Sequence, residues 1–518
     1  MRVDYTALSR FNKAAKKASV KKPSAKKTAA KKNKGYRSYK GSEVVITIEE
    51  AGLYAQISGS FPVSVVDKAT SFAVKGARFS SAYKKGRWDG RTRFMKRPAN
   101  RVPVGLLHLA VEELEKRDVK ITVKDNRKNF ISGLQPVAVK LLPVGFELRE
   151  YQKECVEAAY RAGRGIIHMA TNSGKTECLC ALIKSYGTSF KALVLVRGLE
   201  LLDQMLNRIS LRLGIPVEKI GKIGDSSCTY GHWITVATPD TLYSRRQDLS
   251  VKNFLSSIEL VILDEAHHGS SDSYYKVLEG IAAPHRFGMS GTPLSRSDGA
   301  DMKLMAQTGP VIFKVTNKDL IELGHSVPVT IEFARVTSPN LPEWYQYPQA
   351  VKEGIVNNLL RSEKICNGVL SMVKEGRSVL VLVQRIDHGK ILGKILEGLD
   401  PKNKIPHQFI SGKETSGIRR EALDKFKRGD LKVLISSTIL DEGVDVPSIE
   451  GLVLAGGGKA KIGSLQRIGR GLRTGGKFPD LRVLDCADMT HHYLAEHSLR
   501  RLKIYRKEKV FNIVISDL

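Results

Sequence analysis

The chain has few cysteines, and their positions exclude the common cysteine-based sites. The six cysteines stand at positions 155, 178, 180, 228, 366 and 486, and no two of them form a Cys-x-x-Cys pair. This spacing supports neither a zinc site nor a disulfide framework, and it fits a reducing compartment. No apolar run approaches the roughly 20 residues of a membrane span, so we expect no membrane partner. The lysine-rich amino terminus lacks an apolar core, so we also expect no signal peptide.

Acidic residues are scarce relative to basic ones. The chain of 518 residues contains 84 Lys and Arg but 53 Asp and Glu, which gives a formal net charge of +31. Such an excess favours a polyanionic partner, most simply nucleic acid. The length is sufficient for about three domains with ample core.

Residues 1–41 form a lysine-rich arm. Residues 1–40 contain 14 Lys and Arg and a single acidic residue, Asp4. A stretch of this composition buries too little apolar surface to fold, so we expect a disordered arm that contacts phosphates without reading base sequence. A solubilising tail or a nuclear-import signal is the alternative interpretation.

Residues 42–135 are expected to form a small α+β domain. Apolar alternation predicts strands over residues 44–48 and 119–123, and the spacing of apolar residues predicts a helix over residues 106–114. Residues 63–79 are interpreted as a mixed strand and helix unit. Together these elements are sufficient for a compact domain ahead of the rest of the chain.

A basic and aromatic segment of this domain is a candidate nucleic-acid surface. From Tyr83 to Phe94, Lys and Arg are interleaved with aromatic residues. Guanidinium groups and aromatic rings both bind nucleic acids. The residues expected to make these contacts are Arg87, Trp88, Arg91 and Arg93. The alternative is that Trp88 and Phe94 belong to the core and the basic side chains form a solvated rim.

A short stretch around residue 170 has the order strand, polar loop, helix. The apolar run from Gly165 to Met169 predicts a buried strand, and an apolar helix is expected over residues 177–183. The loop between them ends in Gly174, Lys175 and Thr176. In this context Gly-Lys-Thr is typical of a site where backbone N–H groups and the positive end of a helix hold the phosphates of a nucleotide.

The residues of this loop predict binding of ATP with Mg²⁺. Lys175 is expected to reach the β- and γ-phosphates, and the Thr176 hydroxyl to bind Mg²⁺. Met169 stands where such loops usually have their first glycine. Asn172 is a smaller departure from the usual phosphate-loop sequence, because Asn tolerates positive φ. The other residues expected to line the phosphates are Asn172, Ser173 and Gly174.

Two residues upstream of the loop are candidates for binding the base. Gln152 carries a donor and an acceptor on one amide, which matches the two edges of adenine. Arg149 opens the same segment, Arg-Glu-Tyr-Gln. A lone Gln is usually surface filler, and only its position ahead of Lys175 supports the functional interpretation.

Apolar runs alternate with helical stretches after the loop. This alternation predicts a parallel, doubly wound sheet over residues 136–326. The run Leu260–Leu263 ends in Asp264 and Glu265, and ligands of such sheets bind beyond the carboxyl ends of the strands. We therefore expect Asp264 to hold Mg²⁺ through water and Glu265 to polarise the water that attacks the γ-phosphate.

The motifs of this region resemble those of superfamily 2 helicases. Asp-Glu-Ala-His from Asp264 is similar to motif II of that family, and Ser-Gly-Thr-Pro from Ser290 is similar to motif III. The resemblance implies that Ser290 and Thr292 couple ATP hydrolysis to domain movement. Residues 196–198 and 236–239 resemble the motifs that grip the strand. The nucleic-acid contacts so implied are Arg197, Gly198, Thr238 and Pro239.

A second sheet of the same kind is expected over residues 327–518. Apolar strands are predicted over residues 379–383 and 432–438, and no phosphate loop accompanies them. A phosphoryl group in transfer needs a cation that arrives when the site closes. Arg470 and Arg473 lie three residues apart on one predicted helical face and can supply it. The alternative is a basic helix on a solvated face.

Further residues of this second domain take their roles from the same resemblance. Gln466 begins a segment that matches the Gln-Arg-x-Gly-Arg-x-x-Arg motif of the family, which implies that it acts at the nucleotide together with the two arginines. Gly443 and Asp445 are implied to lie at the ribose. The residues implied to contact the nucleic-acid strand are Gln384, Arg385 and Thr438.

The front of the chain narrows the resemblance. The segment 86–93, Gly-Arg-Trp-Asp-Gly-Arg-Thr-Arg, ahead of Arg-Glu-Tyr-Gln, resembles the UvsW-type helicases of tailed phages. That resemblance implies unwinding and migration of branched DNA in recombination, repair or rescue of replication forks. If a phage encodes the chain, it implies action in the host cytoplasm.

The expected protein is α/β, with two RecA-like doubly wound domains, a small α+β domain and a disordered basic arm. We expect a monomeric helicase that uses ATP and Mg²⁺ on branched, forked or single-stranded DNA. Two alternatives stay open. The same motor could act on RNA or move along duplex without separating it, or the chain could be a non-catalytic architectural DNA-binding protein.

Overall fold

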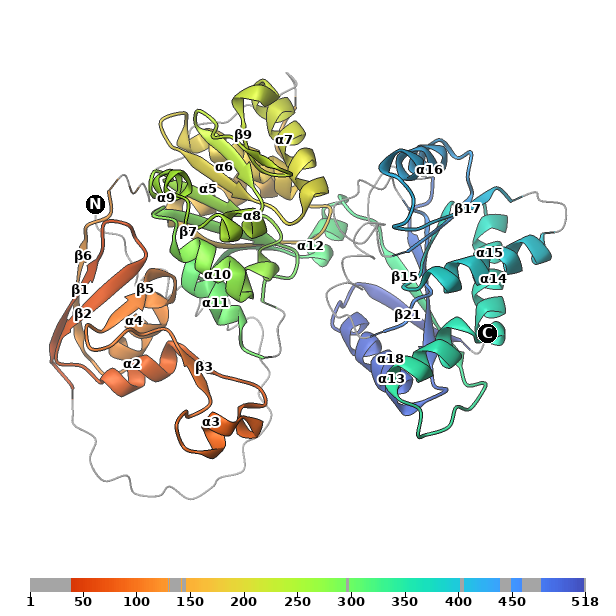
Figure 1. Cartoon of the computed structure of the whole chain (residues 1–518), viewed down its shortest axis with the longest axis horizontal. Helices are drawn as coiled ribbons and strands as arrows, with labels where there is room; N and C mark the ends of the chain where they lie inside the picture. Colours follow the sequence, from red (N-terminus) through yellow and green to blue (C-terminus); the bar gives the residue numbers. More distant parts are fainter. Residues whose placement is uncertain are drawn as a thin grey trace. The chain divides into compact units, whose positions relative to one another are not determined.

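The fold is described from a computed structural model of the chain. It describes residues 39–128, 130, 141, 146–294, 298–400, 405–437, 449–458 and 477–516. The chain divides into two compact units, of which the first holds Met1–Met169 and Gly174–Lys314 and the second holds Ala170–Ser173 and Val315–Leu518 (Figure 1). The sequence-based boundary between residues 326 and 327 falls inside the second unit. Among the described helices, none combines the length and apolar character needed to cross a membrane.

The first unit begins with a four-stranded sheet in the order β5-β2-β1-β6. Its strands are β1 (Glu43–Ile48), β2 (Tyr54–Gly59), β5 (Arg101–Pro103) and β6 (Lys120–Asp125). Alternate residues of β1 are buried, as the apolar alternation predicts, because successive side chains of a strand point to opposite faces. They pack with α2 (Val63–Ala69) and α4 (Leu107–Glu115) in one apolar core.

A small two-stranded sheet extends this front domain. β3 (Ser71–Ala73) pairs antiparallel with β4 (Arg91–Arg93). Between the two strands lie the 3-10 helix η1 (Ala77–Phe79) and the helix α3 (Ser81–Lys84) (Figure 1). The basic and aromatic segment singled out in the sequence therefore forms α3, β4 and the turn that joins them.

An eight-stranded sheet forms the rest of the first unit, in the order β10-β9-β11-β8-β12-β13-β7-β14. The pairs from β9 through β7 are parallel, and β10 pairs antiparallel with β9. Its strands are β7 (Arg164–Met169), β8 (Ala192–Leu195), β9 (Gly221–Gly224), β10 (Ser227–Cys228), β11 (Ile234–Ala237), β12 (Leu260–Leu263), β13 (His285–Ser290) and β14 (Val311–Val315). The parallel, doubly wound sheet predicted from the sequence is confirmed.

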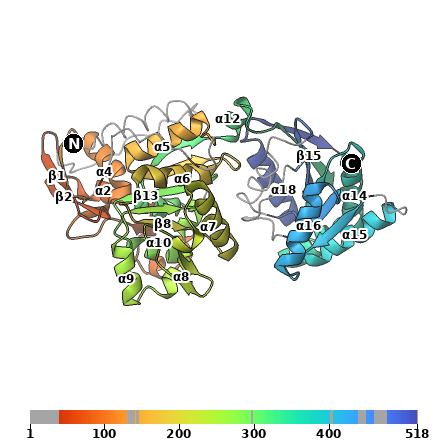
Figure 2. The ribbon, with the colours of Figure 1, turned by 90° about the horizontal axis from the view of Figure 1, so that it is seen from above.

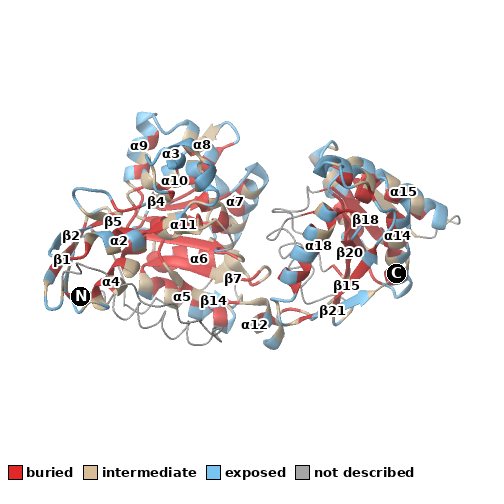
Figure 3. Cartoon of the chain, turned by 90° about the horizontal axis from the view of Figure 1, so that it is seen from below, coloured by how far each residue is buried: buried red, intermediate tan, exposed pale blue. Residues whose placement is uncertain are grey.

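Helices cover both faces of this sheet. They are α5 (Glu150–Ala162), α6 (Lys175–Tyr186), α7 (Leu199–Leu213), α8 (Pro239–Ser244), α9 (Leu249–Ser256), α10 (Asp272–Glu279) and α11 (Asp301–Gln307). Apolar residues of α9, α10 and α11 share one core with β7, β8 and β12, and α5 and α6 lie on the other side of the strands (Figure 2). The strands are buried on both faces (Figure 3), which explains why they consist of continuous apolar runs.

The front domain packs directly on this sheet domain within the first unit. Ala306 of α11 belongs to the apolar core of the front domain. Arg164, which begins β7, donates to the Gly52 carbonyl at 2.6 Å, and the Tyr54 hydroxyl donates to Glu279 at 2.8 Å. The two domains therefore have separate sheets but one continuous interface.

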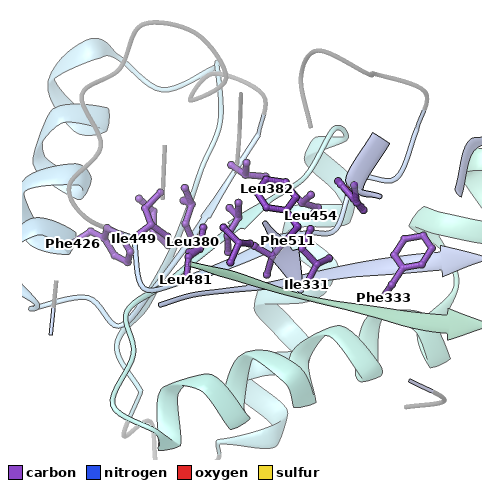
Figure 4. Close-up of a cluster of buried hydrophobic side chains, with 14 of the residues drawn as sticks. Ile331, Phe333, Leu380, Leu382, Phe426, Ile449, Leu454, Leu481 and Phe511 are labelled. Atoms are coloured by element: carbon purple, nitrogen blue, oxygen red, sulfur yellow. The ribbon is translucent and has the colours of Figure 1, made fainter. Parts of the chain in front are cut away.

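The second unit contains a seven-stranded sheet in the order β17-β18-β16-β19-β20-β15-β21, and all of its pairs are parallel. Its strands are β15 (Val329–Val336), β16 (Val379–Leu382), β17 (His407–Ile410), β18 (Val433–Ser436), β19 (Gly451–Leu454), β20 (Leu481–Asp488) and β21 (Phe511–Ser516). Its helices are α12 (Asn317–Glu322), α13 (Tyr347–Val351), α14 (Leu359–Lys374), α15 (Ile386–Leu399), α16 (Ser416–Arg428) and α18 (His492–Tyr505). Two apolar cores pack against this sheet, and Figure 4 shows part of one of them.

Candidate active site

The loop between β7 and α6, predicted from the sequence to be a phosphate loop, contains two residues with positive φ. Gly174 has φ of 75° and stands immediately before Lys175, the first residue of α6. Asn172 has φ of 69°, in the left-handed region that Asn tolerates. Met169 is fully buried, with its sulfur 3.6 Å from the Cys155 sulfur. Met169 therefore belongs to the core beneath the loop, and the turn is made by the residues that follow it.

Gln152 lies directly under this loop. Its side-chain oxygen accepts a hydrogen bond from the Arg149 backbone N–H at 2.9 Å, which caps the start of α5. A Cβ atom on Gly174 would lie 2.2 Å from the Gln152 amide nitrogen. Any other residue here would have to displace the Gln152 amide and would also be strained by the φ of 75°.

The two acidic residues lie at the carboxyl end of β12, next to the phosphate loop. The Asp264 backbone N–H donates to the Leu195 carbonyl at 2.9 Å, so Asp264 continues the strand. The chain then turns at Glu265, whose φ is 45°, a strained value for this residue type. The Lys175 ammonium lies 3.5 Å from the Glu265 carboxylate. The structure thus brings together three charged residues that the sequence places about 90 residues apart.

The two carboxylates differ in their electrostatic surroundings. Burial and the neighbouring charge of Glu265 raise the pKa of Asp264. Burial acts in the same direction on Glu265, but the charge of Lys175 and the contact with His267 outweigh it and lower the Glu265 pKa. Glu265 is therefore ionised and paired, whereas Asp264 carries a charge that lacks a comparable cationic neighbour.

A chain of polar contacts joins Glu265 to the Ser290–Thr292 segment. His267 Nδ1 lies 3.4 Å from the Glu265 carboxylate and 3.0 Å from the Ser290 hydroxyl. The Thr292 backbone N–H donates to the same hydroxyl at 3.1 Å. Ser290 is fully buried. His267 therefore links Glu265 to the Ser290–Thr292 segment.

His168 is a site residue that the sequence analysis did not single out. It precedes Met169 on β7, and its Nε2 lies 2.9 Å from the Gly291 carbonyl. Because a carbonyl only accepts, the ring donates through Nε2. Burial, followed by the charges of Lys314 and Lys175, lowers the His168 pKa to about 4, so the ring is neutral near pH 7. The sequence does contain a signal for His168, because it is a polar residue within the apolar run of β7.

The residues expected to grip the nucleic acid in this sheet domain have different exposures. Arg197 is exposed and contacts the His268 ring at 3.0 Å, and Gly198 is also exposed, with φ of 82°. Thr238 is buried, and its hydroxyl donates to the Thr241 hydroxyl at 2.8 Å. Pro239 is buried as the first residue of α8. Arg197 is therefore the accessible cation of this set.

The basic segment of the front domain combines internal contacts with exposed charge. Arg91 donates to the Ser71 hydroxyl at 2.9 Å and to the Ser71 carbonyl at 2.9 Å, and Trp88 donates to the Arg91 carbonyl at 2.8 Å. Arg93 pairs with Asp67 at 2.8 Å and also contacts Asp89. Arg87 is exposed. Phe94 is buried in the domain core, as the alternative interpretation expected.

The candidate residues of the second unit fall into two groups. Gln384 donates to the Gly457 carbonyl at 3.2 Å just after β16, and the adjacent Arg385 is exposed. The remaining candidates lie outside the described residues. These are Thr438, Gly443, Asp445, Gln466, Arg470 and Arg473.

Two family models match the chain, and each covers part of one of the two large sheets. Residues 145–295 match the model described as the res subunit of type III restriction enzymes. Residues 361–475 match the helicase conserved C-terminal domain. With the two RecA-like sheets and the phosphate loop, these matches identify the chain as an ATP-dependent helicase of superfamily 2.

Individual proteins of known name are similar to this chain. The chain is 25% identical over 495 residues to the ATP-dependent DNA helicase uvsW of Enterobacteria phage T4, which covers 86% of this chain and 94% of that relative. It is 27% identical over 388 residues to the DNA 3'-5' translocase XPB2 of Sulfurisphaera tokodaii, covering 68% of this chain and 86% of that relative. A solved fragment assigned as the HsdR subunit of a type I restriction enzyme from Vibrio vulnificus YJ016 shares the fold, with a TM-score of 0.53, 17% identity, and coverage of 72% of this chain and 70% of that one.

Proposed function

We propose that this helicase hydrolyses ATP with Mg²⁺ and uses the energy to unwind or migrate branched or forked DNA. The observation that carries the chemical part is the juxtaposition of Lys175 and Glu265 at 3.5 Å, with Asp264 adjacent, beyond the carboxyl ends of β7 and β12, which flank β13. A lysine at a helix start and two carboxylates at a strand end supply cationic, metal-binding and water-orienting groups in one place.

The residues of the site fit a nucleotide and a divalent cation. Gly174 lets the loop pack against the Gln152 amide, where a Cβ would lie 2.2 Å from the amide nitrogen, and the N-terminus of α6 that follows would direct N–H groups to phosphate oxygens. The raised pKa of Asp264 reflects buried negative charge that a divalent cation would neutralise. Thr176 and Asp264 would hold Mg²⁺, which when bound would stabilise charge on the phosphates. Arg149, Gln152 and the loop residues Asn172 and Ser173 would hold the nucleotide.

Glu265 would orient the water that attacks the γ-phosphate and accept its proton. It is ionised, and its strained backbone fixes the carboxylate beyond the end of β12. Lys175 would move from Glu265 to the phosphates when ATP binds, because the γ-phosphate is the stronger anion. This exchange would release Glu265 for catalysis, and the contact through His267 would report it to Ser290 and Thr292.

The family resemblance also implies roles in ATP hydrolysis for residues of the second unit. Arg470 and Arg473 would stabilise the charge that develops on the transferred phosphoryl group, and Gln466 would contribute beside them. Gly443 and Asp445 would bind the ribose. Substitution of either arginine should lower kcat far more than nucleotide affinity, since the contact is made chiefly in the transition state.

DNA is the proposed partner because of three independent observations. The net charge is +31, Arg197 and Arg87 are exposed, and the two relatives named above are a DNA helicase and a DNA translocase. The proposed contact residues further include Gly198, Thr238, Pro239, Gln384, Arg385, Thr438, Trp88, Arg91 and Arg93. Arg91 and Arg93 would act chiefly by fixing the β3–β4 sheet, because their guanidinium groups are engaged by Ser71 and Asp67. We further propose that the protein acts as a monomer.

The test is ATPase activity measured with single-stranded, duplex, forked and four-way DNA and with an RNA duplex. Stimulation by forked or four-way DNA above the other substrates supports the proposal. Equal stimulation by plain duplex without strand separation would favour a duplex translocase, the activity named for the XPB2 relative. Stimulation of the ATPase by the RNA duplex would indicate that the same motor acts on RNA. Absence of turnover on every substrate would leave an architectural DNA-binding protein.

A further inference from the structure

Three side chains of the second unit converge away from the phosphate loop. Glu343 lies in the segment between β15 and α13, and His491 and His492 lie at the start of α18. Each offers one ligand atom, and the three atoms lie within 4.8 Å of one another. The His492 Nδ1 is already 2.8 Å from the Glu343 carboxylate. We propose that these three residues form a binding site for a transition-metal ion of the Zn²⁺ type.

His491 supplies an observation independent of this proximity. The residue is 3% exposed, and its Nε2 is buried without a hydrogen-bond partner among the described residues. Leaving a buried polar atom unsatisfied costs about 1–3 kcal/mol. The two surface partners, Glu343 and His492, form an ordinary exposed pair by themselves. The buried His491 ring beside them, with a centroid 4.2 Å from the His492 ring, turns the pair into a three-ligand group.

The proton positions permit this coordination. The Nδ1 atom of His491 accepts a hydrogen bond from the Tyr493 backbone N–H at 3.4 Å. A metal bound at Nε2 requires the ring proton to move to Nδ1, which breaks this contact. This contact caps the start of α18, so metal binding must also offset the loss of a cap hydrogen bond that is long and weak at 3.4 Å. The Glu343 charge offsets the unfavourable effect of a cation near the positive end of α18.

The donor set selects the class of metal. Two imidazole nitrogens and one carboxylate oxygen suit Zn²⁺ and its neighbours, with a water as the fourth tetrahedral ligand. Mg²⁺ and Ca²⁺ prefer all-oxygen shells and would not compete. Bonds of about 2.0–2.1 Å place tetrahedral ligands roughly 3.3 Å apart. The present separations therefore require the ligands to close by at most about 1.5 Å, and the exposed Glu343 and His492 side chains can move by that amount.

A metal here would fasten two segments that are far apart in the sequence. Glu343 would be tied to the start of α18, and with it the neighbouring Trp344, whose side chain is 78% exposed. The ion would therefore order the segment before α13 and raise the thermal stability of the second unit. It would not take part in ATP hydrolysis, and the proposal does not depend on the function of the phosphate loop.

The test is metal binding by the full chain after chelator treatment, without nucleotide. Zn²⁺ is titrated by calorimetry and Co²⁺ by visible absorption, which reports tetrahedral coordination. The variants are Glu343→Gln and His492→Ala, both exposed and expected to fold normally. The matched control is His232→Ala, an exposed histidine of the first unit. His491→Ala is a further variant, interpreted only if circular dichroism shows it folded.

The wild-type protein and His232→Ala should bind one equivalent that excess Mg²⁺ does not displace. Glu343→Gln and His492→Ala should bind at least about 10-fold more weakly and lose the tetrahedral Co²⁺ absorption. ATPase activity of these variants at saturating substrate should equal that of the wild type. Binding that is the same in wild type and in the double variant Glu343→Gln/His492→Ala would overturn the proposal, as would binding through oxygen ligands that Mg²⁺ displaces.

Discussion

The two large sheets are built alike but use their charged residues differently. In the second unit, buried arginines pair with buried aspartates, Arg361 with Asp488 at 2.7 Å and Arg501 with Asp485 at 2.8 Å. In the first unit the buried Arg286 donates instead to the Gln307 side chain and to backbone carbonyls. A buried charge needs partners wherever it lies. In the second sheet these two aspartates are paired with arginines, whereas in the first sheet Asp264 and Glu265 lie at the end of β12.

This difference distinguishes charged residues of the candidate active site from charged residues that stabilise the fold. Asp264 and Glu265 are half-buried, and Glu265 pairs at 3.5 Å with Lys175 on the phosphate loop. One carboxylate oxygen of Asp485 accepts from both Arg501 and the Tyr505 hydroxyl, so its charge is paired within the fold. Changes in the first set should therefore affect chemistry, and changes in the second set should affect folding.

The largest expected effect is on ATP turnover in the first unit. Lys175→Ala should abolish turnover while leaving DNA binding largely intact, because the proposed DNA contacts lie elsewhere. Glu265→Gln should still bind ATP but fail to activate the water, and should stay bound to DNA. Steady-state phosphate release and DNA affinity, measured for both variants and the wild type, provide the check. Loss of both activities together in Lys175→Ala would show that the residue is structural, and an unchanged kcat in Glu265→Gln would remove it from the mechanism.

The next largest effect should be on the stability of the second unit. Asp485→Asn removes the carboxylate that contacts the Arg501 guanidinium at 2.8 Å, while the Asp488 carboxylate stays at 3.9 Å. Arg501 is 2% exposed, so water does not replace the lost partner. Breaking a buried ion pair in this way costs about 3–5 kcal/mol. Hydrogen exchange monitored by mass spectrometry should show lost protection in β20 and α18 and unchanged protection in β12 and β13.

The control for this variant is Glu496→Gln on the same helix. Glu496 pairs with Arg500 at the surface, where both side chains are about half exposed. Such pairs contribute less than about 1 kcal/mol, so exchange in α18 should remain close to that of the wild type. Equal effects of the two substitutions would contradict the distinction drawn between the two sheets.

Much of this difference could be predicted from the sequence, and part of it could not. Apolar runs placed the strands of both sheets, because fully buried parallel strands leave a continuous hydrophobic signature. The order of strand, Gly-Lys-Thr and helix placed Lys175, and the strand before Asp264 placed the two carboxylates. The Arg361–Asp488 pair joins residues that are far apart in the sequence, and no local pattern indicates which Arg meets which Asp. His168 was overlooked for a similar reason, since its partner is the backbone carbonyl of Gly291.

A smaller effect should appear in the pH dependence of stability. The His168 pKa is lowered to about 4 in the folded protein, against about 6.5 in the unfolded chain. The unfolded chain therefore binds the proton first as the pH falls, so stability is present above pH 6.5 and is lost toward pH 4. Full expression of this shift corresponds to at most about 3 kcal/mol.

His168→Gln provides the measurement. Gln keeps an N–H donor for the Gly291 carbonyl but does not titrate. Denaturant unfolding between pH 7 and pH 4.5 should therefore show a smaller loss of stability in this variant than in the wild type, in the transition that reports the first unit. Parallel curves for the two proteins would mean that the ring is protonated in the folded state or that its environment opens before unfolding.

The smallest effect on chemistry is expected from removing residues 1–40. They contain 14 basic residues and one acidic residue, against a net charge of +31 for the whole chain. Lysines that contact phosphates release counterions, and each contact adds about one unit to the slope of log affinity against log salt. The truncated protein should bind every DNA more weakly and with a shallower salt dependence.

Its kcat at saturating DNA should be nearly unchanged, because Lys175, Asp264 and Glu265 all remain. Preference for forks should also survive if it resides around Arg87 in the folded front domain. The measurement is log affinity against log salt for the full-length and truncated proteins, on a fork and on plain duplex. Identical slopes would show that the arm does not touch DNA. A loss of fork preference with unchanged duplex affinity would instead move recognition from the β3–β4 sheet to the arm, and would end the assignment of Arg87 to DNA.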